Sequence, residues 1–387
     1  MPYQILVLTG LILCYINIIL NLLLLKRPLR GAPCPDNPSM VSVLIPARNE
    51  QNNIEQCISS VLKQDYPNFE VIVLDDNSED RTAEIVDKIV KVDGRVRLIH
   101  GRPLPGGWAG KCFACHQLSQ KAVGQWLLFI DADTVCQTHM IRSTLDIADR
   151  GNVALLSGLP QQKVSGLTQK IVIPILFYFL IMSWFPLWLL HASKKPRPTL
   201  AIGQFLLFKR DDYIRIGGHE VVKSRIMEDV WFGIEMSRRG GRTLSVDLSS
   251  TITTKMYSDL GSMTEGCLKW FYSVAALSPL ALIGCVLAAY IFFLAPFYWA
   301  YVIPLNSLLS GNIIIDAGMF VVLQIAVIFL MRLTVDWRFR GSKLSFIFHP
   351  LGTAFLMLTV FYGLARRALG AGVVWKDRVY QSISHIK

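Results

Sequence analysis

The sequence contains no cysteine pattern of the kind that marks a disulfide framework. Its 8 cysteines are scattered over 387 residues, and several lie within apolar runs. Disulfides persist in oxidising compartments, so this scatter favours a reducing, cytosolic environment for the water-exposed part of the chain. One zinc-like spacing occurs, between Cys112 and Cys115, but no second pair completes a set of four ligands. We therefore interpret these two cysteines as packing residues.

Acidic residues are scarce relative to basic ones. The chain has 28 Asp and Glu against 39 Lys and Arg, which gives a formal net charge of +11 at pH 7. Much of the surplus lies beside long apolar segments, where it favours attraction to anionic lipid over binding to nucleic acid. We therefore expect a membrane as a partner, and no nucleic acid.

The N-terminal segment lacks the features of a cleaved signal peptide, namely a basic start, a short apolar core and a small-residue cleavage site. Residues 5–25 instead form an uncharged run of about twenty residues, the length of a membrane-spanning helix. Lys26, Arg27 and Arg30 follow it, and basic residues mark the cytoplasmic side of a span. The sequence predicts an uncleaved anchor over residues 1–27, in a protein of the plasma membrane whose next domain is cytoplasmic.

Further apolar runs occupy the C-terminal third, over residues 275–303, 313–331 and 344–364. They predict a transmembrane region over residues 274–366, followed by a basic tail over residues 367–387. One anchor plus three spans would leave the basic tail outside the cell, against the usual charge bias. A broken or re-entrant pair of helices around Pro279, Pro296 and Pro304 would change the number of crossings and return the basic tail to the cytoplasmic side. The number of spans and the side of the tail therefore stay open.

Between the apolar ends, short apolar runs alternate with amphipathic segments. We expect strands at residues 41–45, 70–74, 96–99 and 126–130, and helices at residues 54–62, 82–90 and 111–122. This alternation predicts an α/β fold with a largely parallel sheet covered on both faces. Ligands of such sheets collect at the carboxyl ends of the strands. Residues 46–50, 75–77 and 131–133 all follow strands, so we expect them at one edge of the sheet.

Another apolar run, residues 171–190, interrupts this domain and is long enough to span a bilayer. A crossing there would put Asp131 and Asp133 on the opposite side of the membrane from Glu228 and Asp229. The run instead carries residues that suit a helix in the membrane interface, namely Pro174, Trp184, Pro186, Trp188, His191, Lys194 and Lys195. We therefore predict an interfacial segment over residues 171–192.

The sequence has no complete phosphate-binding P-loop. Residues 106–111 approach the G-x-x-x-x-G-K-[ST] pattern, but Pro105 replaces its first glycine and Cys112 its final hydroxyl residue. A P-loop nucleotidase is therefore excluded. Lys111, close to the start of a predicted helix, can still contact a diphosphate, with the help of the helix N-terminus.

Asp131 and Asp133 stand one residue apart, directly after the apolar run of residues 126–130. Their carboxylate oxygens are hard ligands, which suit Mg²⁺ or Mn²⁺ and, through the metal, a diphosphate. The alternative is an acidic turn or helix cap that binds no ligand.

Four ordered motifs resemble those of the family 2 glycosyltransferases: residues 41–50, residues 73–82, Asp131-Ala-Asp133 and Glu228-Asp229. The resemblance implies a GT-A catalytic domain over residues 38–270, with a Rossmann-like, mixed but mostly parallel sheet. It also implies a nucleotide-sugar donor, a UDP-sugar above all, and Mg²⁺ or Mn²⁺ as cofactor. Within the family, the chain is most similar to the membrane-anchored group associated with hopanoid and carotenoid glycosylation, through residues 217–220, 255–257 and 375–380.

The resemblance assigns the donor side of the site. It places the nucleobase loop at Pro46, Ala47, Asn49 and Glu50, the base or ribose contacts at Asp75 and Asp76, and the ribose and metal contacts at Asp131 and Asp133. The segment around Asp75 and Asp76 has an alternative role, because Asp76, Asn77 or Ser78 could cap the helix that begins at Thr82.

The acceptor side begins with Glu228 and Asp229, an acidic pair that would ordinarily complement the dipole of the helix that follows. In the family pattern the second carboxylate is the general base, so we expect Asp229, beside Glu228, to take the proton of the acceptor hydroxyl. One in-line displacement would then invert the anomeric centre. His219 and Glu220 are expected on the acceptor side, with a structural, hydrogen-bonding histidine as the alternative.

Residues 266–270 stand where processive synthases of the same family carry Gln-x-x-Arg-Trp. The glutamine is absent, and Lys269 replaces an arginine whose hydrogen-bond geometry lysine does not reproduce. Lys269 and Trp270 are still expected on the acceptor side. We predict transfer of a single sugar to a hydroxyl of a membrane lipid, of isoprenoid or glycerolipid type, at the cytoplasmic face. The alternatives are a processive polysaccharide synthase with a membrane conduit, and a membrane scaffold with an inactive transferase domain.

Overall fold

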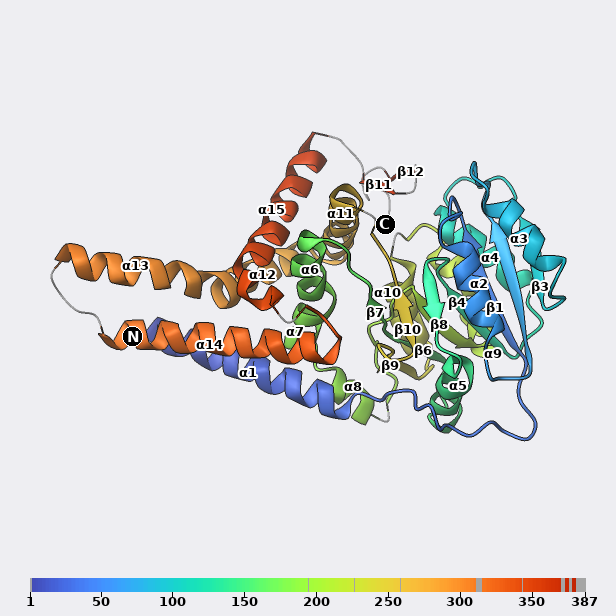
Figure 1. The fold of residues 1–387 in the computed structure, drawn as a ribbon, viewed down its shortest axis with the longest axis horizontal. Helices are drawn as coiled ribbons and strands as arrows, with labels where there is room; N and C mark the ends of the chain where they lie inside the picture. Colours follow the sequence, from blue (N-terminus) through green and yellow to red (C-terminus); the bar gives the residue numbers. More distant parts are fainter. Residues whose placement is uncertain are drawn as a thin grey trace. The chain divides into compact units, whose positions relative to one another are not determined.

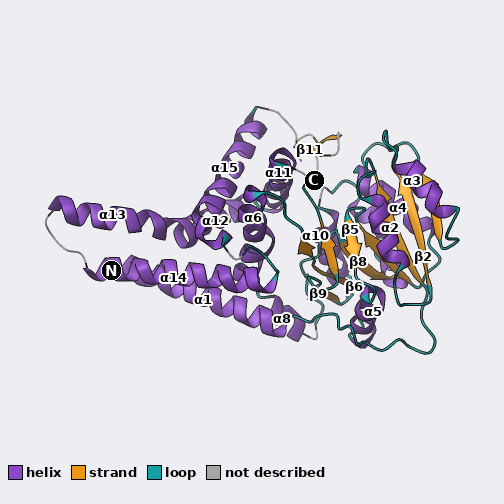
Figure 2. Ribbon diagram, in the orientation of Figure 1, coloured by secondary structure: helices purple, strands orange, loops and turns teal. Residues whose placement is uncertain are grey.

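The structure is a computed structural model that describes residues 2–193, 195–225, 227–257, 259–310, 315–342, 344–369, 373–375 and 378–380. The chain divides into two compact units (Figure 1). The sheet unit comprises Leu25–Lys163 and Leu187–Met256, and the helical unit comprises Met1–Leu24, Val164–Pro186 and Tyr257–Lys387. The central strands all belong to the sheet unit, whereas the described part of the helical unit is mostly helix (Figure 2).

A seven-stranded sheet in the order β3-β2-β1-β4-β8-β6-β9 forms the centre of the sheet unit. Its strands are β1 (Val41–Ala47), β2 (Phe69–Asp75), β3 (Val96–His100), β4 (Trp126–Ile130), β6 (Leu155–Leu159), β8 (Phe205–Lys209) and β9 (Thr243–Asp247). Neighbouring strands are parallel except around β8, which runs antiparallel to both β4 and β6. A smaller sheet in the order β5-β10-β7 contains β5 (Thr134–Cys136), β7 (Gln161–Gln162) and β10 (Ile252–Thr254).

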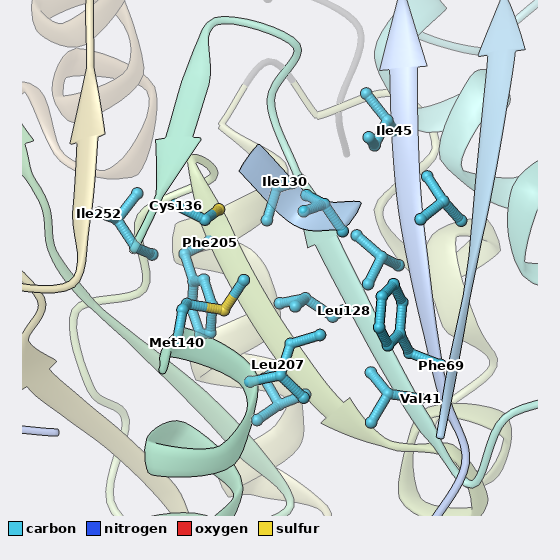
Figure 3. Packing of buried hydrophobic residues seen from close by; sticks show 14 of the residues in the cluster. Val41, Ile45, Phe69, Leu128, Ile130, Cys136, Met140, Phe205, Leu207 and Ile252 are labelled. Atoms are coloured by element: carbon cyan, nitrogen blue, oxygen red, sulfur yellow. The ribbon is translucent and has the colours of Figure 1, made fainter. Parts of the chain in front are cut away.

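Helices of the same unit cover both faces of the large sheet. They are α2 (Ile54–Leu62), α3 (Thr82–Val90), α4 (Gly110–Lys121), α5 (Met140–Arg150), α8 (Leu187–Ala192), α9 (Arg210–Arg215), the 3₁₀ turn η2 (Gly218–Val222) and α10 (Glu228–Arg238). Side chains alternate across a strand, so a sheet covered on both faces needs strands that are apolar at every position. Val43 of β1 accordingly belongs to a buried cluster with residues of α2, α3 and α5, and the adjacent Leu44 belongs to a second cluster with residues of α4 and α10. Figure 3 shows the first of these clusters, in which Leu128 of β4, Leu207 of β8 and Met140 of α5 are buried together.

This layered arrangement confirms the predicted α/β fold with a mostly parallel sheet. The predicted helices 54–62 and 82–90 and the predicted strand 126–130 agree with the structure at both ends. The predicted strands 41–45, 70–74 and 96–99 and the predicted helix 111–122 differ by one or two residues at their ends. The antiparallel β8 was not predicted.

Gly158 of β6 lies very close to the neighbouring strand, and this gives a first testable prediction. A Cβ atom added at Gly158 would stand 2.1 Å from the carbonyl oxygen of Val246 on β9. Because that neighbour is backbone in a paired strand, Gly158→Ala should separate β6 from β9 and cost about 3 kcal/mol of stability. The apparent melting temperature of the detergent-solubilised protein should fall by several degrees. Gly94→Ala is the matched control, since nothing lies within 4 Å of its added Cβ atom, and an equal effect of both variants would contradict the prediction.

The helical unit consists of α1 (Pro2–Leu24), α6 (Leu167–Pro174), η1 (Ile175–Phe179), α7 (Leu180–Trp184), α11 (Leu260–Leu277), α12 (Pro279–Ala289), η3 (Tyr290–Leu294), α13 (Ala295–Ser310), α14 (Ile315–Arg338), η4 (Ser345–Phe348) and α15 (His349–Ala368), with the short strands β11 (Val373–Trp375) and β12 (Arg378–Tyr380). The helix α14 lies beside both α1 and α13, whereas α15 packs on α11 and α6 (Figure 1). The π-helical turn η1 directly follows Pro174, which has no N–H for the regular helical hydrogen bond.

Polar side chains of α1 bind the end of α7. The amide nitrogen of Asn17 donates to the carbonyl oxygen of Met182 at 3.0 Å, and that of Asn21 to the carbonyl oxygen of Phe185 at 2.8 Å. These carbonyl groups lie at a helix end, where the helix itself offers no donor. Asn21 is buried, so its hydrogen bonds replace water that the apolar surroundings exclude.

Among the described residues, five helical stretches are long and apolar enough to cross a membrane: Pro2–Leu24, Leu167–Trp184, Pro279–Pro304, Ala317–Arg338 and Ser345–Arg366. Their number and composition indicate a membrane-associated protein. The division of the chain differs from the predicted domains, because residues 164–186 and 257–270 group with the helical unit instead of with a continuous domain over residues 38–270. Lys194 and most of the predicted basic tail lie outside the described residues.

Candidate active site

The sheet brings the predicted donor-side residues to one edge. Strands β2, β1 and β4 are parallel neighbours, and Ala47 at the end of β1 pairs in register with Asp75 at the end of β2. The segments that follow these strands therefore emerge side by side, as predicted for residues 46–50, 75–77 and 131–133.

The loops after β1 and β2 are joined to each other by hydrogen bonds. The N–H of Asn49 donates to the hydroxyl of Ser78 at 3.0 Å, and the N–H of Glu79 donates to the side-chain oxygen of Asn49 at 2.9 Å. Asn49 has a φ of 52° and Asn77 a φ of 54°, a left-handed conformation that asparagine tolerates better than most residues. Each loop thus fixes the shape of the other.

Asp75 and Asp76 lie beneath these loops and do not cap the next helix. Both carboxylates belong to buried residues, and Oδ1 of Asp75 accepts no hydrogen bond from the part of the chain that the structure describes. At the start of α3, the N–H of Thr82 instead donates to Asp80 at 2.9 Å. The cap alternative for residues 76–78 is therefore wrong, and Asp75 retains a free acceptor at the strand end. Pro46 and Ala47, predicted in the loop, are the last residues of β1, whereas Glu50 lies in the loop that follows and is buried.

Lys111 joins the donor side to the acidic pair. Its Nζ atom lies 2.8 Å from Oδ1 of Asp131 and 3.0 Å from Oε1 of Glu228. Burial disfavours the charged ammonium, but the charges of Asp131 and Glu228 outweigh burial and raise the pKa of Lys111 well above its usual value. The cluster thus connects the N-terminal end of α4, the end of β4 and the N-terminal end of α10.

Asp229, the neighbour of Glu228, is oriented by backbone donors. Its Oδ2 atom accepts a hydrogen bond from the N–H of Gly203 at 2.7 Å, and its Oδ1 atom accepts from the N–H of Val230 at 2.9 Å. A carboxylate held in this way has its direction set before any ligand arrives.

Gly203 is the residue of this cluster that the sequence did not reveal. A Cβ atom placed on it would stand 3.0 Å from Nζ of Lys111, 3.3 Å from Oδ2 of Asp229 and 3.4 Å from Oε1 of Glu228. A glycine followed by glutamine before an apolar strand is too common a pattern to indicate such a position. Only the pairing of β8 with β4 brings it to the site.

The predicted acceptor-side residues belong to two units, His219 and Glu220 to the sheet unit, and Lys269 and Trp270 to the helical unit. His219 is fully buried, its Nδ1 atom lies 2.6 Å from the hydroxyl of Tyr213, and its ring packs against Phe129 and Phe232. Burial, followed by the charges of Lys111 and His116, holds the pKa of His219 well below its usual value. These contacts favour the structural alternative for this histidine.

The remaining acceptor-side residues stay predictions. Glu220 is exposed on η2. Lys269 and Trp270 are half-buried on α11 of the helical unit, where Trp270 packs edge-on against Phe177 with ring centroids 6.0 Å apart.

Asp131 and Asp133 could hold a divalent metal. Both follow β4, and the side chain of Asp131 is 27% exposed, so a bound ion could reach solvent and a ligand. Within the described ranges, no three His, Cys, Asp or Glu side chains converge as a ready-made metal cage. Magnesium sites that bind phosphates commonly use one or two carboxylates and take their other ligands from the phosphate and water. The donor set fits that type of site.

A parallel-sheet domain with these acidic segments at its carboxyl edge has the architecture of a GT-A domain. Its fold is similar to that of the mannosyltransferase PcManGT from Pyrobaculum calidifontis, solved in complex with GDP-Man and Mn²⁺, with a TM-score of 0.53 and 16% sequence identity over 94% of this chain and 97% of that one. Residues 42–216 match the family model described as glycosyl transferase family 2. They form a family 2 glycosyltransferase domain, which confirms the family and the GT-A fold predicted from the four motifs.

Curated relatives agree with this family. The chain is 27% identical over 241 residues to the 4,4'-diaponeurosporenoate glycosyltransferase of Staphylococcus haemolyticus. The aligned region covers 59% of this chain and 60% of that protein. The chain is also 31% identical over 104 residues to the glycosyltransferase GlyG of Streptococcus pneumoniae, in an aligned region that covers 27% of this chain and 33% of that protein. The chain thus matches less than two thirds of the length of these relatives.

Proposed function

We propose that the protein is a metal-dependent glycosyltransferase that transfers one sugar from a nucleotide-sugar donor to a hydroxyl of a membrane lipid, with inversion. The observation that carries the proposal is the junction at Lys111, whose ammonium contacts Asp131 on the donor side and Glu228 beside Asp229. Two acidic segments far apart in the sequence thereby share one site, and each has the chemistry that its half of the reaction requires.

On the donor side, the loops after β1 and β2 would receive the nucleoside, with Asp75 as an acceptor for its N–H or O–H groups. Asp131 and Asp133 would hold Mg²⁺ or Mn²⁺, which when bound neutralises negative charge on the diphosphate. Lys111 is placed to contact the same diphosphate as a point charge.

On the acceptor side, Asp229 would accept the proton of the attacking hydroxyl. A bond forms between the acceptor oxygen and C1 of the sugar while the bond from C1 to the diphosphate oxygen breaks, and the electron pair leaves with the nucleoside diphosphate. A single displacement of this kind inverts the anomeric centre. The N–H of Gly203 keeps the carboxylate of Asp229 in a fixed orientation for this step.

The lipid acceptor and the cytoplasmic face rest on the membrane-type helices. Strands β7 and β8 flank residues 164–186 and both belong to the sheet unit, which supports entry and exit of this segment on the same side of a membrane. That connectivity supports an interfacial segment instead of a single crossing. The basic residues Lys26, Arg27 and Arg30 after the first helix support a cytoplasmic sheet unit. The name of the carotenoid-type relative supports an isoprenoid acceptor over a glycerolipid.

A transfer assay tests the proposed function. The full-length protein in detergent would receive radiolabelled UDP-sugars and GDP-sugars in turn, together with a total membrane lipid extract and Mn²⁺. We expect label from one donor to enter the organic phase as a product that carries one sugar. Label in a water-soluble polymer would contradict single-sugar transfer, and absence of transfer from every donor would contradict the proposal.

Gly203→Ala should impair catalysis without unfolding the protein. The three atoms nearest to the added methyl group would be the ends of the Lys111, Asp229 and Glu228 side chains, which can move by a few tenths of an ångström. Such a shift misaligns the base, and a displacement below 1 Å can cost about tenfold to a hundredfold in rate. We expect that loss in turnover at an unchanged melting temperature. Gly94→Ala is the control and should keep the turnover of the wild type. Normal turnover of Gly203→Ala would contradict the role given to this backbone position.

A further inference from the structure

Lys111 occupies a position that the metal would also need. Its Nζ atom stands 2.8 Å from Oδ1 of Asp131, which is a normal ion-pair distance and leaves no room for a divalent ion on the same side of that oxygen. A metal bound to Asp131 on that side must therefore displace the ammonium. The ammonium and a divalent cation would therefore compete for one carboxylate.

The surroundings restrict where the ammonium can go. Glu228 holds it from a second direction at 3.0 Å, and the side chain of Glu228 is only 5% exposed. The backbone at Gly203 closes a third direction, since a Cβ atom there would stand 3.0 Å from Nζ. The Lys111 side chain is itself 34% exposed, so part of it faces solvent, from which a ligand would come.

We propose that Lys111 is a built-in counter-ion that holds the metal position in the donor-free protein and releases it when the nucleoside diphosphate binds. The ammonium exchanges the Asp131 carboxylate for the diphosphate, and Asp131 would then be open to hold the divalent cation. Metal and donor then bind as a pair, and neither binds tightly alone. This inference rests on the proposed function and deepens it by stating how the donor is admitted.

The inference predicts effects of opposite sign on metal and nucleotide. Without the ammonium, Asp131 is open to the metal, so Mn²⁺ alone should bind more tightly. The diphosphate loses a cationic contact, so UDP or GDP should bind more weakly in the presence of saturating Mn²⁺. A lysine with a purely structural role would not raise the affinity for Mn²⁺ when it is removed.

The test measures Mn²⁺ binding to the full-length protein in detergent by the electron paramagnetic resonance signal of free Mn²⁺, without nucleotide. Lys111→Gln and Lys111→Met should each bind Mn²⁺ at least about tenfold more tightly than the wild type, and the nucleotide affinity should fall about tenfold. The glutamine variant keeps an N–H donor for Glu228, which protects folding. Lys121→Gln, at the exposed far end of the same helix, is the matched control and should behave as the wild type.

Equal or weaker Mn²⁺ binding by both variants would overturn the inference. If both variants fail to fold, the wild type decides: UDP or GDP should raise its Mn²⁺ affinity at least about tenfold, and an unchanged affinity would overturn the inference. Failure of the wild type to bind either nucleotide, with or without Mn²⁺, would instead contradict the proposed function.

Discussion

Replacing Asp229 with asparagine is expected to lower the turnover number about a thousandfold, within the range by which general base catalysis accelerates reactions. The amide oxygen of asparagine can still accept the hydrogen bond from the N–H of Gly203, although its amide nitrogen cannot accept the one from the N–H of Val230. What it loses is the capacity to take the proton from the acceptor hydroxyl. The measurement is steady-state transfer of labelled sugar to lipid, together with nucleotide binding.

Nucleotide affinity should change little in Asp229→Asn, because the donor contacts are assigned to other residues. Asp87→Asn provides a control with the same chemical change on the exposed face of α3, and it should retain full turnover. Turnover of Asp229→Asn within about threefold of the wild type would remove Asp229 from the role of general base.

Asp133→Ala is expected to have the second largest effect, a loss of about a hundredfold to a thousandfold in turnover. Its carboxylate is one of the two that would hold the divalent metal after β4, and without the metal the leaving nucleotide carries uncompensated charge. The loss should be accompanied by weaker Mn²⁺ binding in the presence of UDP or GDP. An excess of Mn²⁺ should therefore recover part of the activity.

Chelation gives an independent measure of the same contribution. Removal of metal from the wild type should reduce turnover to about the level of Asp133→Ala and should barely affect the variant itself. Asp87→Ala is the matched control. If Asp133→Ala retained wild-type turnover and wild-type response to metal, Asp133 would not be a metal ligand.

The core of the sheet unit could be predicted from local sequence because its signal is local. Buried strands such as Trp126–Ile130 are apolar throughout, and amphipathic helices such as Ile54–Leu62 show the helical period with polar residues at their ends. The acidic segments could be placed at one edge for a topological reason. Parallel strands present their carboxyl ends together, so residues 46–50, 75–77 and 131–133 converge once the strands are recognised.

The contacts between those segments could not be predicted, because they depend on long-range pairing. Nothing near Phe205–Lys209 shows that this strand inserts antiparallel between β4 and β6, although that insertion brings Gly203 to Asp229. Lys111 was expected at a diphosphate, and its ion pairs with Asp131 and Glu228 depend on three elements at once. The chemical type of each side chain could be inferred from the sequence, whereas the residues that it contacts could not.

The helical segments show a further limit of composition. Residues 171–190 are apolar enough to read as a span, and Leu167–Trp184 indeed has the length and composition of one. Hydropathy alone does not tell a crossing helix from one buried among other helices. The interfacial segment over residues 171–192 therefore stays a prediction.

The anomeric configuration of the glycolipid product tests the central claim most directly. The wild-type protein would be incubated with an α-linked nucleotide sugar, its acceptor lipid and Mn²⁺, and the coupling constant of the anomeric proton would be measured by NMR. A single displacement with Asp229 as base predicts a β-linked product that carries one sugar. An α-linked product would contradict that mechanism, because retention requires a second nucleophile or a different attack geometry.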